Sequence, residues 1–207
     1  MAESPRPAKV DMVLVGVGGQ GTILASNILA DLGLRIGYDV KKAEVHGMSQ
    51  RGGSVISHVR WGAEVHSPII PAGAADLLLA VEQMEAGRYA GLLRPGGTAL
   101  VNEFTIEPIT VITGGAHYPS RDEIESAYAV PARRLLWVPG AAVATELGNK
   151  HVANIVLLGA LSRLLPAVPE QDWVDAIERQ VKPSHRELNR RAFEIGRSDA
   201  HVPGPGV

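Results

Sequence analysis

Six residues near the start of the chain, Gly16–Gly21, have the spacing G-x-G-x-x-G. They follow an apolar run typical of a buried strand and precede a segment with helical periodicity. In that setting Gly16 allows a tight turn, Gly18 lets a ligand approach the backbone, and Gly21 lets the helix pack close to the strand. Free N–H groups at a helix start attract anions, so a phosphate site is predicted. The candidate cofactor-binding residues are Gly16, Gly18, Gly19, Gln20 and Gly21.

The residues around this loop distinguish between kinds of phosphate site. A P-loop requires Lys and then Ser or Thr after the last glycine, and the presence of Thr22 and Ile23 there argues against a P-loop NTPase. A nicotinamide site requires an acidic residue roughly 20 residues further on, and Glu44 lies somewhat late for that role. Glycines that only form a tight strand-to-helix junction remain an equal alternative.

A second polar segment, residues 44–54, leaves the carboxyl end of the next predicted strand, where open α/β sheets bind ligands. Within it Arg51 carries a fixed positive charge, and its planar guanidinium could bind a carboxylate or a phosphate. A solvated arginine on a surface loop is the alternative. The residues predicted to face an active site or a partner are Glu44, His46, Met48, Ser49, Gln50, Arg51, Gly52, Gly53 and Ser54.

The sequence identifies no catalytic residue and predicts no metal site. His46 and His58 could act as general bases, but neither a Ser–His–Asp arrangement nor a metal-ligand spacing supports that role. A lone histidine is more often structural. The catalytic residue therefore stays unknown.

The elements that would position these residues alternate between strands and helices. Strands are predicted over residues 10–16, 40–45, 54–61, 75–81, 98–102 and 135–138. Helices are predicted over residues 20–36, 82–92, 120–128, 149–165, 169–180 and 183–196. Alternating polarity over 54–61 favours an antiparallel strand, and Ser120 with Glu123 forms a capping box. The pattern predicts an α/β fold, a Rossmann-like three-layer α/β/α sandwich with a mostly parallel, mixed sheet.

Four stretches of the chain are distinguished. Residues 1–9 are predicted to be a flexible N-terminus, 10–148 the α/β/α domain, 149–197 a C-terminal helical extension packed on it, and 198–207 a flexible tail. The helix predicted over 149–165 is apolar around most of its circumference, so we expect it to be buried in the domain or against a partner.

The amino-acid composition argues against several classes of function. The 207 residues carry a formal net charge of -2 and only 4% aromatic residues, which argues against a nucleic-acid-binding surface. Because the chain has 0 cysteines, it cannot hold a cysteine-ligated iron–sulfur cluster or a thiolate zinc site. Its apolar runs are far shorter than the roughly 20 residues that span a bilayer. We therefore expect a cytoplasmic protein with no membrane partner.

The two polar segments together resemble a known family. Residues 16–21 followed by 44–54 look like the gamma subunit or domain of 2-oxoacid:ferredoxin oxidoreductases, with most similarity to the indolepyruvate branch, where this piece is called the beta subunit. Residues 75–80, 93–98 and 147–154 support the resemblance, which covers about 10–165.

The resemblance implies one part of a larger oxidoreductase. That enzyme decarboxylates a 2-oxoacid oxidatively, transfers the acyl group to coenzyme A and passes two electrons to ferredoxin, an iron–sulfur protein. Thiamine diphosphate, Mg and the iron–sulfur clusters would belong to a larger partner subunit. This chain would bind no cofactor alone and would help to form the active-site cleft, with the glycine loop as a candidate for the coenzyme A phosphates or for a subunit contact. A homodimer is left open.

Two other functions are compatible with the glycine loop. The chain could be a stand-alone Rossmann-like protein that binds NAD(P) or FAD. It could also be a non-catalytic nucleotide sensor or scaffold, in which the loop serves only as an anion-binding turn.

Overall fold

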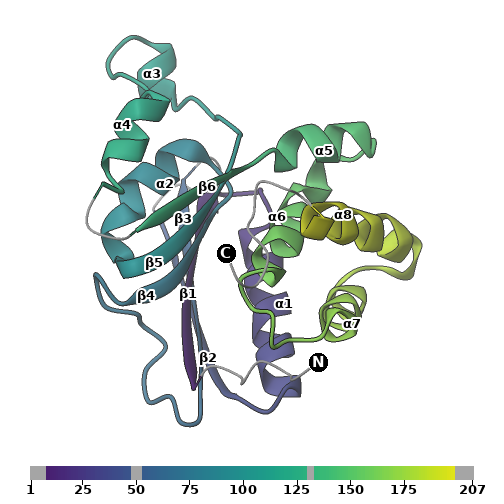
Figure 1. Cartoon of the computed structure of the whole chain (residues 1–207). Coiled ribbons are helices and arrows are strands. Elements are labelled where there is room, and N and C mark those ends of the chain that lie inside the picture. Colours follow the sequence, from purple (N-terminus) through teal and green to yellow (C-terminus); the bar gives the residue numbers. More distant parts are fainter. Residues whose placement is uncertain (1–7, 48–52, 130–132, 199–207) are drawn as a thin grey trace.

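A single mixed sheet organises the molecule (Figure 1). The computed structural model describes residues 8–47, 53–129 and 133–198. Within them the strands are β1 (Lys9–Val17), β2 (Asp39–His46), β3 (Ser54–Gly62), β4 (Ala75–Ala80), β5 (Leu93–Asn102) and β6 (Arg134–Val138). Their order across the sheet is β2-β3-β1-β4-β5-β6. The predicted flexible ends fall mostly on residues 1–7 and 199–207, which lie outside the described residues.

The helices follow the strands in an alternating order. They are α1 (Thr22–Arg35), α2 (Gln83–Tyr89), α3 (Ile109–Ile112), α4 (Arg121–Ser126), α5 (Gly140–Glu146), α6 (Ala153–Ser162), α7 (Glu170–Gln180) and α8 (Arg186–Ser198). Short 3-10 turns are η1 (Ala90–Leu92), η2 (Lys150–Val152) and η3 (Pro183–His185). The predicted capping box begins α4, where Ser120 and Glu123 exchange both hydrogen bonds.

Strand β3 is antiparallel to both of its neighbours, whereas β1, β4, β5 and β6 pair in parallel. The antiparallel direction expected from the alternating sequence of β3 is confirmed. Helix α1 joins β1 to β2, and β3 inserts between these two strands. Because Ser54 pairs with Val17, β3 begins beside the glycine loop.

Helices cover both faces of the sheet and make three layers (Figure 1). One face packs against α1 and α5 to α8 around side chains such as Leu14 and Trp61. The other face packs against α2 and α4 around Val13 and Leu78. The three-layer α/β/α sandwich with a mixed sheet is therefore confirmed.

Several element boundaries differ from the sequence prediction, and one helix was not predicted. Helix α1 starts two residues later than predicted, because Gly21 is its N-cap with φ 80°. Strand β5 begins at Leu93, before the predicted start at residue 98, and its register against β4 shifts near Ala75. Helix α5 has no predicted counterpart, since seven residues are too few to show periodicity. The run of C-terminal helices thus starts at Gly140 and not at residue 149.

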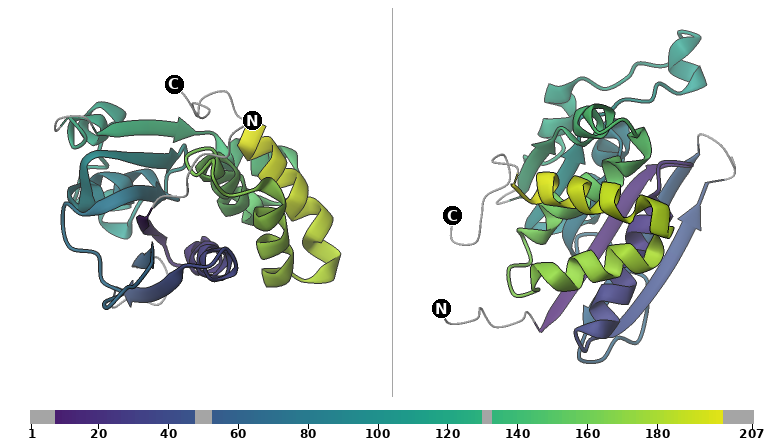
Figure 2. Two further views of the ribbon diagram at one scale, coloured as in Figure 1. Left: turned by 60° about the horizontal axis from the view of Figure 1, so that its bottom comes forward. Right: turned by 90° about the vertical axis from the view of Figure 1, so that its right-hand side faces the viewer.

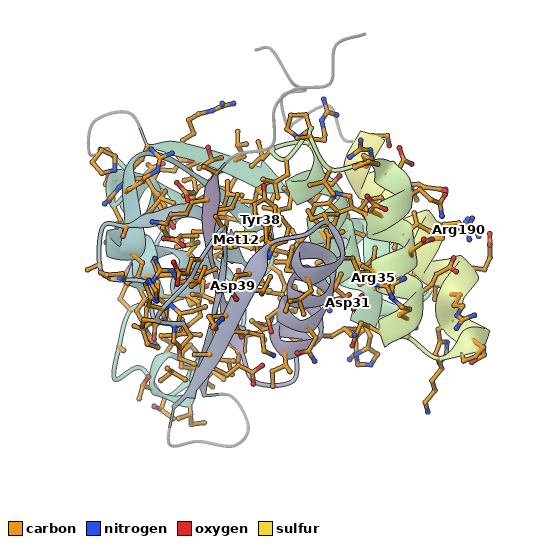
Figure 3. The ribbon with its side chains drawn as sticks, turned by 90° about the horizontal axis from the view of Figure 1, so that it is seen from below. Met12, Asp31, Arg35, Tyr38, Asp39 and Arg190 are labelled. Carbon is orange, nitrogen blue, oxygen red and sulfur yellow. The ribbon has the colours of Figure 1, made fainter. Side chains whose placement is uncertain are left out.

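The C-terminal helices stack outward from the sheet (Figure 2). All residues of α6 from Asn154 to Ser162 are buried, as its apolar sequence predicts. Helix α7 is linked to α1 through Asp31, which accepts from Arg35 at 3.2 Å and from Arg179 at 2.9 Å. Figure 3 shows Asp31 and Arg35 on the side of α1 toward these helices. No described helix is long and apolar enough to cross a membrane.

His58 gives the fold a pH dependence. Its Nδ1 accepts from the Ile70 N–H at 3.3 Å in the interior, and burial, followed by the charge of Arg60, lowers its pKa below 6.5. The unfolded chain therefore binds a proton at a pH where the folded chain does not, so stability falls as pH drops through about 6.5. Urea unfolding at about pH 7.5 and about pH 5.5 should show a smaller loss for His58→Gln than for the wild type. An equal loss in both would contradict this role.

Candidate functional site

A pocket of about 390 Å³ lies at the carboxyl edge of the parallel strands, which points upward in Figure 1. The glycine loop, the ends of β4 and β5, and the starts of α5 and α6 line it. Helix α1, which follows β1, packs on one face of the sheet, and α2, which follows β4, packs on the other. The crevice between such strands is where open α/β sheets bind ligands.

One side of this pocket suits an anion. Gly19 lines it with φ 95°, a left-handed conformation that favours glycine. Helix α1 starts beside it with no side-chain cap and no acidic residue in its first turn. The N–H groups of that turn are therefore unmatched by a side chain and attract negative charge. Lys150 and His151 line the same pocket and are exposed, and the lysine adds a positive charge.

Another part of the pocket lining is apolar. Phe104, with 39% of its surface exposed, and Ile106 line it, together with Val81 at the end of β4. Asn102 at the end of β5 joins the two sides, because its Nδ2 donates to the Val81 carbonyl at 3.1 Å and its Oδ1 accepts from the Ala141 N–H at 3.0 Å. The pocket therefore combines an anion-attracting end with an apolar wall.

The contacts of the glycines in the loop differ from the roles that the motif predicts for them. The Gly18 N–H donates to the Gly53 carbonyl at 2.9 Å, and Gln20 Oε1 accepts from the Val17 N–H at 2.7 Å, so these two groups build the turn. A Cβ at Gly16 would lie 2.9 Å from Thr22 Oγ1. A Cβ at Gly21 would overlap the amide of Asn154 on α6. The motif predicts that Gly21 lets the helix pack close to the strand. In the structure, the missing Cβ of Gly21 makes room for Asn154 on α6 instead.

The described residues of the second polar segment meet the glycine loop at Gly53 and Ser54 and do not line the pocket. Glu44 lies within β2 and pairs with Lys42 at 2.5 Å, and β3 separates its strand from β1. His46 is the last residue of β2. Gly53 holds Gly18, and Ser54 Oγ lies 2.5 Å from Glu85 Oε2. The predicted residues that lie outside the described part of the chain are Met48, Ser49, Gln50, Arg51 and Gly52.

Sequence reasoning missed several pocket residues. Lys150 and His151 belong to the segment 147–154, which supported the family resemblance but was assigned no role. The only sequence signal for Asn102 was that it is a polar residue at the end of a predicted strand. Phe104 and Ile106 follow in a segment without periodicity, and only the folded chain shows where they lie.

The metal chemistry of the chain is restricted by its side chains. In residues 8–47, 53–129 and 133–198 there is no group of three or more His, Asp or Glu placed to hold a metal ion. The whole sequence has 0 cysteines, so cysteine ligation of a cluster is excluded throughout.

Comparisons with known proteins agree with this fold. The profile of the family described as pyruvate ferredoxin/flavodoxin oxidoreductase matches residues 11–198. An indolepyruvate oxidoreductase subunit IorB from Thermococcus kodakarensis is 41% identical over 189 residues, which cover 90% of this chain and 93% of that protein. The gamma subunit of a keto/oxoacid ferredoxin oxidoreductase from Geobacter sulfurreducens has a TM-score of 0.67 at 26% identity, covering 90% of this chain and 95% of that one.

A third similar protein is larger. The 2-oxoglutarate:ferredoxin oxidoreductase from Magnetococcus marinus, solved with 2-oxoglutarate, coenzyme A and succinyl-CoA bound, has a TM-score of 0.70 at 19% identity. The match covers 92% of this chain but 31% of that one. At this identity the likeness shows the fold alone.

Proposed function

Since this chain belongs to the pyruvate ferredoxin/flavodoxin oxidoreductase family, we propose that it is the gamma-type subunit of an enzyme that oxidises indolepyruvate or a related 2-oxoacid. The chain is homologous to subunits of 2-oxoacid:ferredoxin oxidoreductases, which use an iron–sulfur protein as electron acceptor. The preference for indolepyruvate is supported by the Thermococcus kodakarensis relative, which has nearly the same length. The enzyme would release carbon dioxide, pass two electrons to ferredoxin and leave the acyl group on coenzyme A.

The pocket at the glycine loop carries the proposal. Coenzyme A has several phosphate charges and an adenine ring, which match the anion-attracting end and the apolar wall of the pocket. The first turn of α1 and Lys150 would bind phosphate, while Phe104 and Ile106 would contact the ring. The coenzyme A bound in the Magnetococcus marinus protein is consistent with such a ligand in this fold.

The remaining groups are assigned to a partner. Thiamine diphosphate, Mg and the clusters would lie on a larger subunit, because this chain has 0 cysteines and its described residues offer no metal-ligand cluster. This chain would contribute one side of the cleft. The proposal places the complex in the cytoplasm, which agrees with a chain that has no cysteine for disulfides.

The test is to purify the full chain alone and with the larger subunit that copurifies with it from the native cell. The chain alone should oxidise no 2-oxoacid, whereas the complex should reduce ferredoxin with indolepyruvate and coenzyme A. Calorimetry on the chain alone compares coenzyme A with NAD and FAD. Micromolar binding of NAD or FAD, or a complex inactive with every 2-oxoacid, would contradict the proposal.

A further inference from the structure

Two buried carboxylates stand in the first turn after β4. Glu82 is 0% exposed and Glu85 is 1% exposed, although neither lines the pocket. A buried charge is costly unless several donors surround it. An N-cap needs only one side-chain oxygen, and Glu82 meets that need by accepting from the Glu85 N–H at 3.0 Å. The other contacts of this pair therefore need an explanation of their own.

Glu82 holds the apolar wall of the pocket. Its Oε1 accepts from the Ile106 N–H at 3.1 Å and from the Tyr118 hydroxyl. The adjacent Gln83 N–H donates to the Phe104 carbonyl at 3.1 Å. Burial, followed by the hydrogen bond to Glu82, raises the pKa of Tyr118 well above its ordinary value, so its hydroxyl stays a donor. The Met84 N–H also donates to the Tyr118 hydroxyl at 3.1 Å, so the wall is attached to the start of α2 by the Glu82 carboxylate and by the N–H groups of Gln83 and Met84.

Glu85 holds the side that carries the glycine loop. The Ser54 hydroxyl lies 2.5 Å from Glu85 Oε2 and 2.9 Å from the Tyr89 hydroxyl, and Arg88 pairs with Glu85 at 3.0 Å. The residue before Ser54 accepts the Gly18 N–H at 2.9 Å. The pKa of Glu85 is raised, mainly by burial and to a smaller extent by the nearby charge of Glu82. The hydrogen bond from Ser54 and the charge of Arg88 lower this pKa but do not cancel the effect of burial. This carboxylate is retained at an electrostatic cost, and through Ser54 it supports the loop.

We propose that Glu82 and Glu85 are positioning residues, which set the distance between the apolar wall and the glycine loop and so shape the pocket for coenzyme A. The inference rests on the proposed function, because it takes coenzyme A as the ligand. Neither residue touches that ligand. Each acts through a neighbour, Glu82 through Tyr118 and Ile106, and Glu85 through Ser54.

The experiment removes one hydroxyl from each side of the pocket in the complete complex. Tyr118→Phe and Ser54→Ala should each raise KM for coenzyme A by about five-fold, with kcat changed by less than about two-fold. Ser54→Thr keeps the hydroxyl and should restore KM. The matched control is Tyr128→Phe, because the buried Tyr128 hydroxyl donates to the Ala86 carbonyl of the same helix at 2.7 Å but reaches neither side.

The outcomes separate this inference from the proposed function. Should Tyr118→Phe and Ser54→Ala change KM no more than Tyr128→Phe does, the positioning role is wrong. A uniform loss of kcat in all three, with unchanged KM, also overturns it, since that result reports general destabilisation. Tyr118→Phe tests the apolar wall and Ser54→Ala tests the loop side. If one of these variants fails to fold, the KM of the other still decides whether the positioning role holds. If Gly19→Asp also leaves KM for coenzyme A unchanged, the part of the proposed function that places coenzyme A in this pocket is wrong, and the subunit assignment is tested separately by the activity of the complex.

Discussion

Alanine at Gly159 or Gly196 is expected to destabilise the protein by more than about 3 kcal/mol, above the usual range for overpacking. Helices α6 and α8 cross at these two glycines with their backbones in contact. A Cβ at Gly159 would overlap the Phe193 carbonyl oxygen and lie 2.7 Å from the Arg197 nitrogen, and one at Gly196 would overlap the Val156 carbonyl oxygen. Alanine gains about 1 kcal/mol of helix propensity over glycine, which is too little to offset the separation of two packed helices.

Thermal and urea unfolding would measure this loss. A fall in Tm of about 10 °C is expected for a chain of this size. Gly91→Ala is the matched control, because a Cβ there meets nothing within 4 Å. If Gly196→Ala unfolds within about 1 kcal/mol of Gly91→Ala, the helices are able to shift apart at little cost and the argument from close backbone contact is wrong.

The substitution Gly19→Asp is expected to raise KM for coenzyme A by about 30-fold or more, equivalent to about 2 kcal/mol. The pocket side that carries Gly19 has an uncapped helix start, which favours anions. A negative charge within a few ångströms of a bound phosphate repels it by an energy of this order at a protein surface. The effect should weaken as salt is added, since the site is open to solvent.

Gly19→Asn is the matched control for Gly19→Asp. Both side chains have the same shape, both tolerate a positive φ better than most residues, and a Cβ at this position meets nothing within 4 Å. The backbone strain at φ 95° is therefore common to both variants, and the difference in KM between them reports charge. Equal KM values would mean that no phosphate lies at the loop.

Local sequence was sufficient to predict those elements that are specified by interactions between residues a few positions apart. The capping box of Ser120 and Glu123 starts α4 as predicted, because both of its hydrogen bonds are made inside one helical turn. The alternation of apolar residues over 54–61 reports the antiparallel β3. The predicted start of the strand at residue 98 was wrong, because β5 already pairs with β4 at Leu93 and runs through residues 94–97 across a shift in register.

By itself, the sequence determined the fold class, the position of the glycine loop and the exclusion of cysteine-ligated clusters. It did so because helix and strand periodicity, glycine spacing and cysteine content are properties of neighbouring residues or of composition. Only the tertiary structure decided that β3 inserts between β1 and β2, which moves Glu44 one strand away from the loop. It also brought Lys150 and Phe104 to the pocket at the glycine loop, and it joined Glu82 to Ile106 and Glu85 to Ser54. Such contacts join residues far apart in the chain, so they depend on how the whole sheet is ordered and packed.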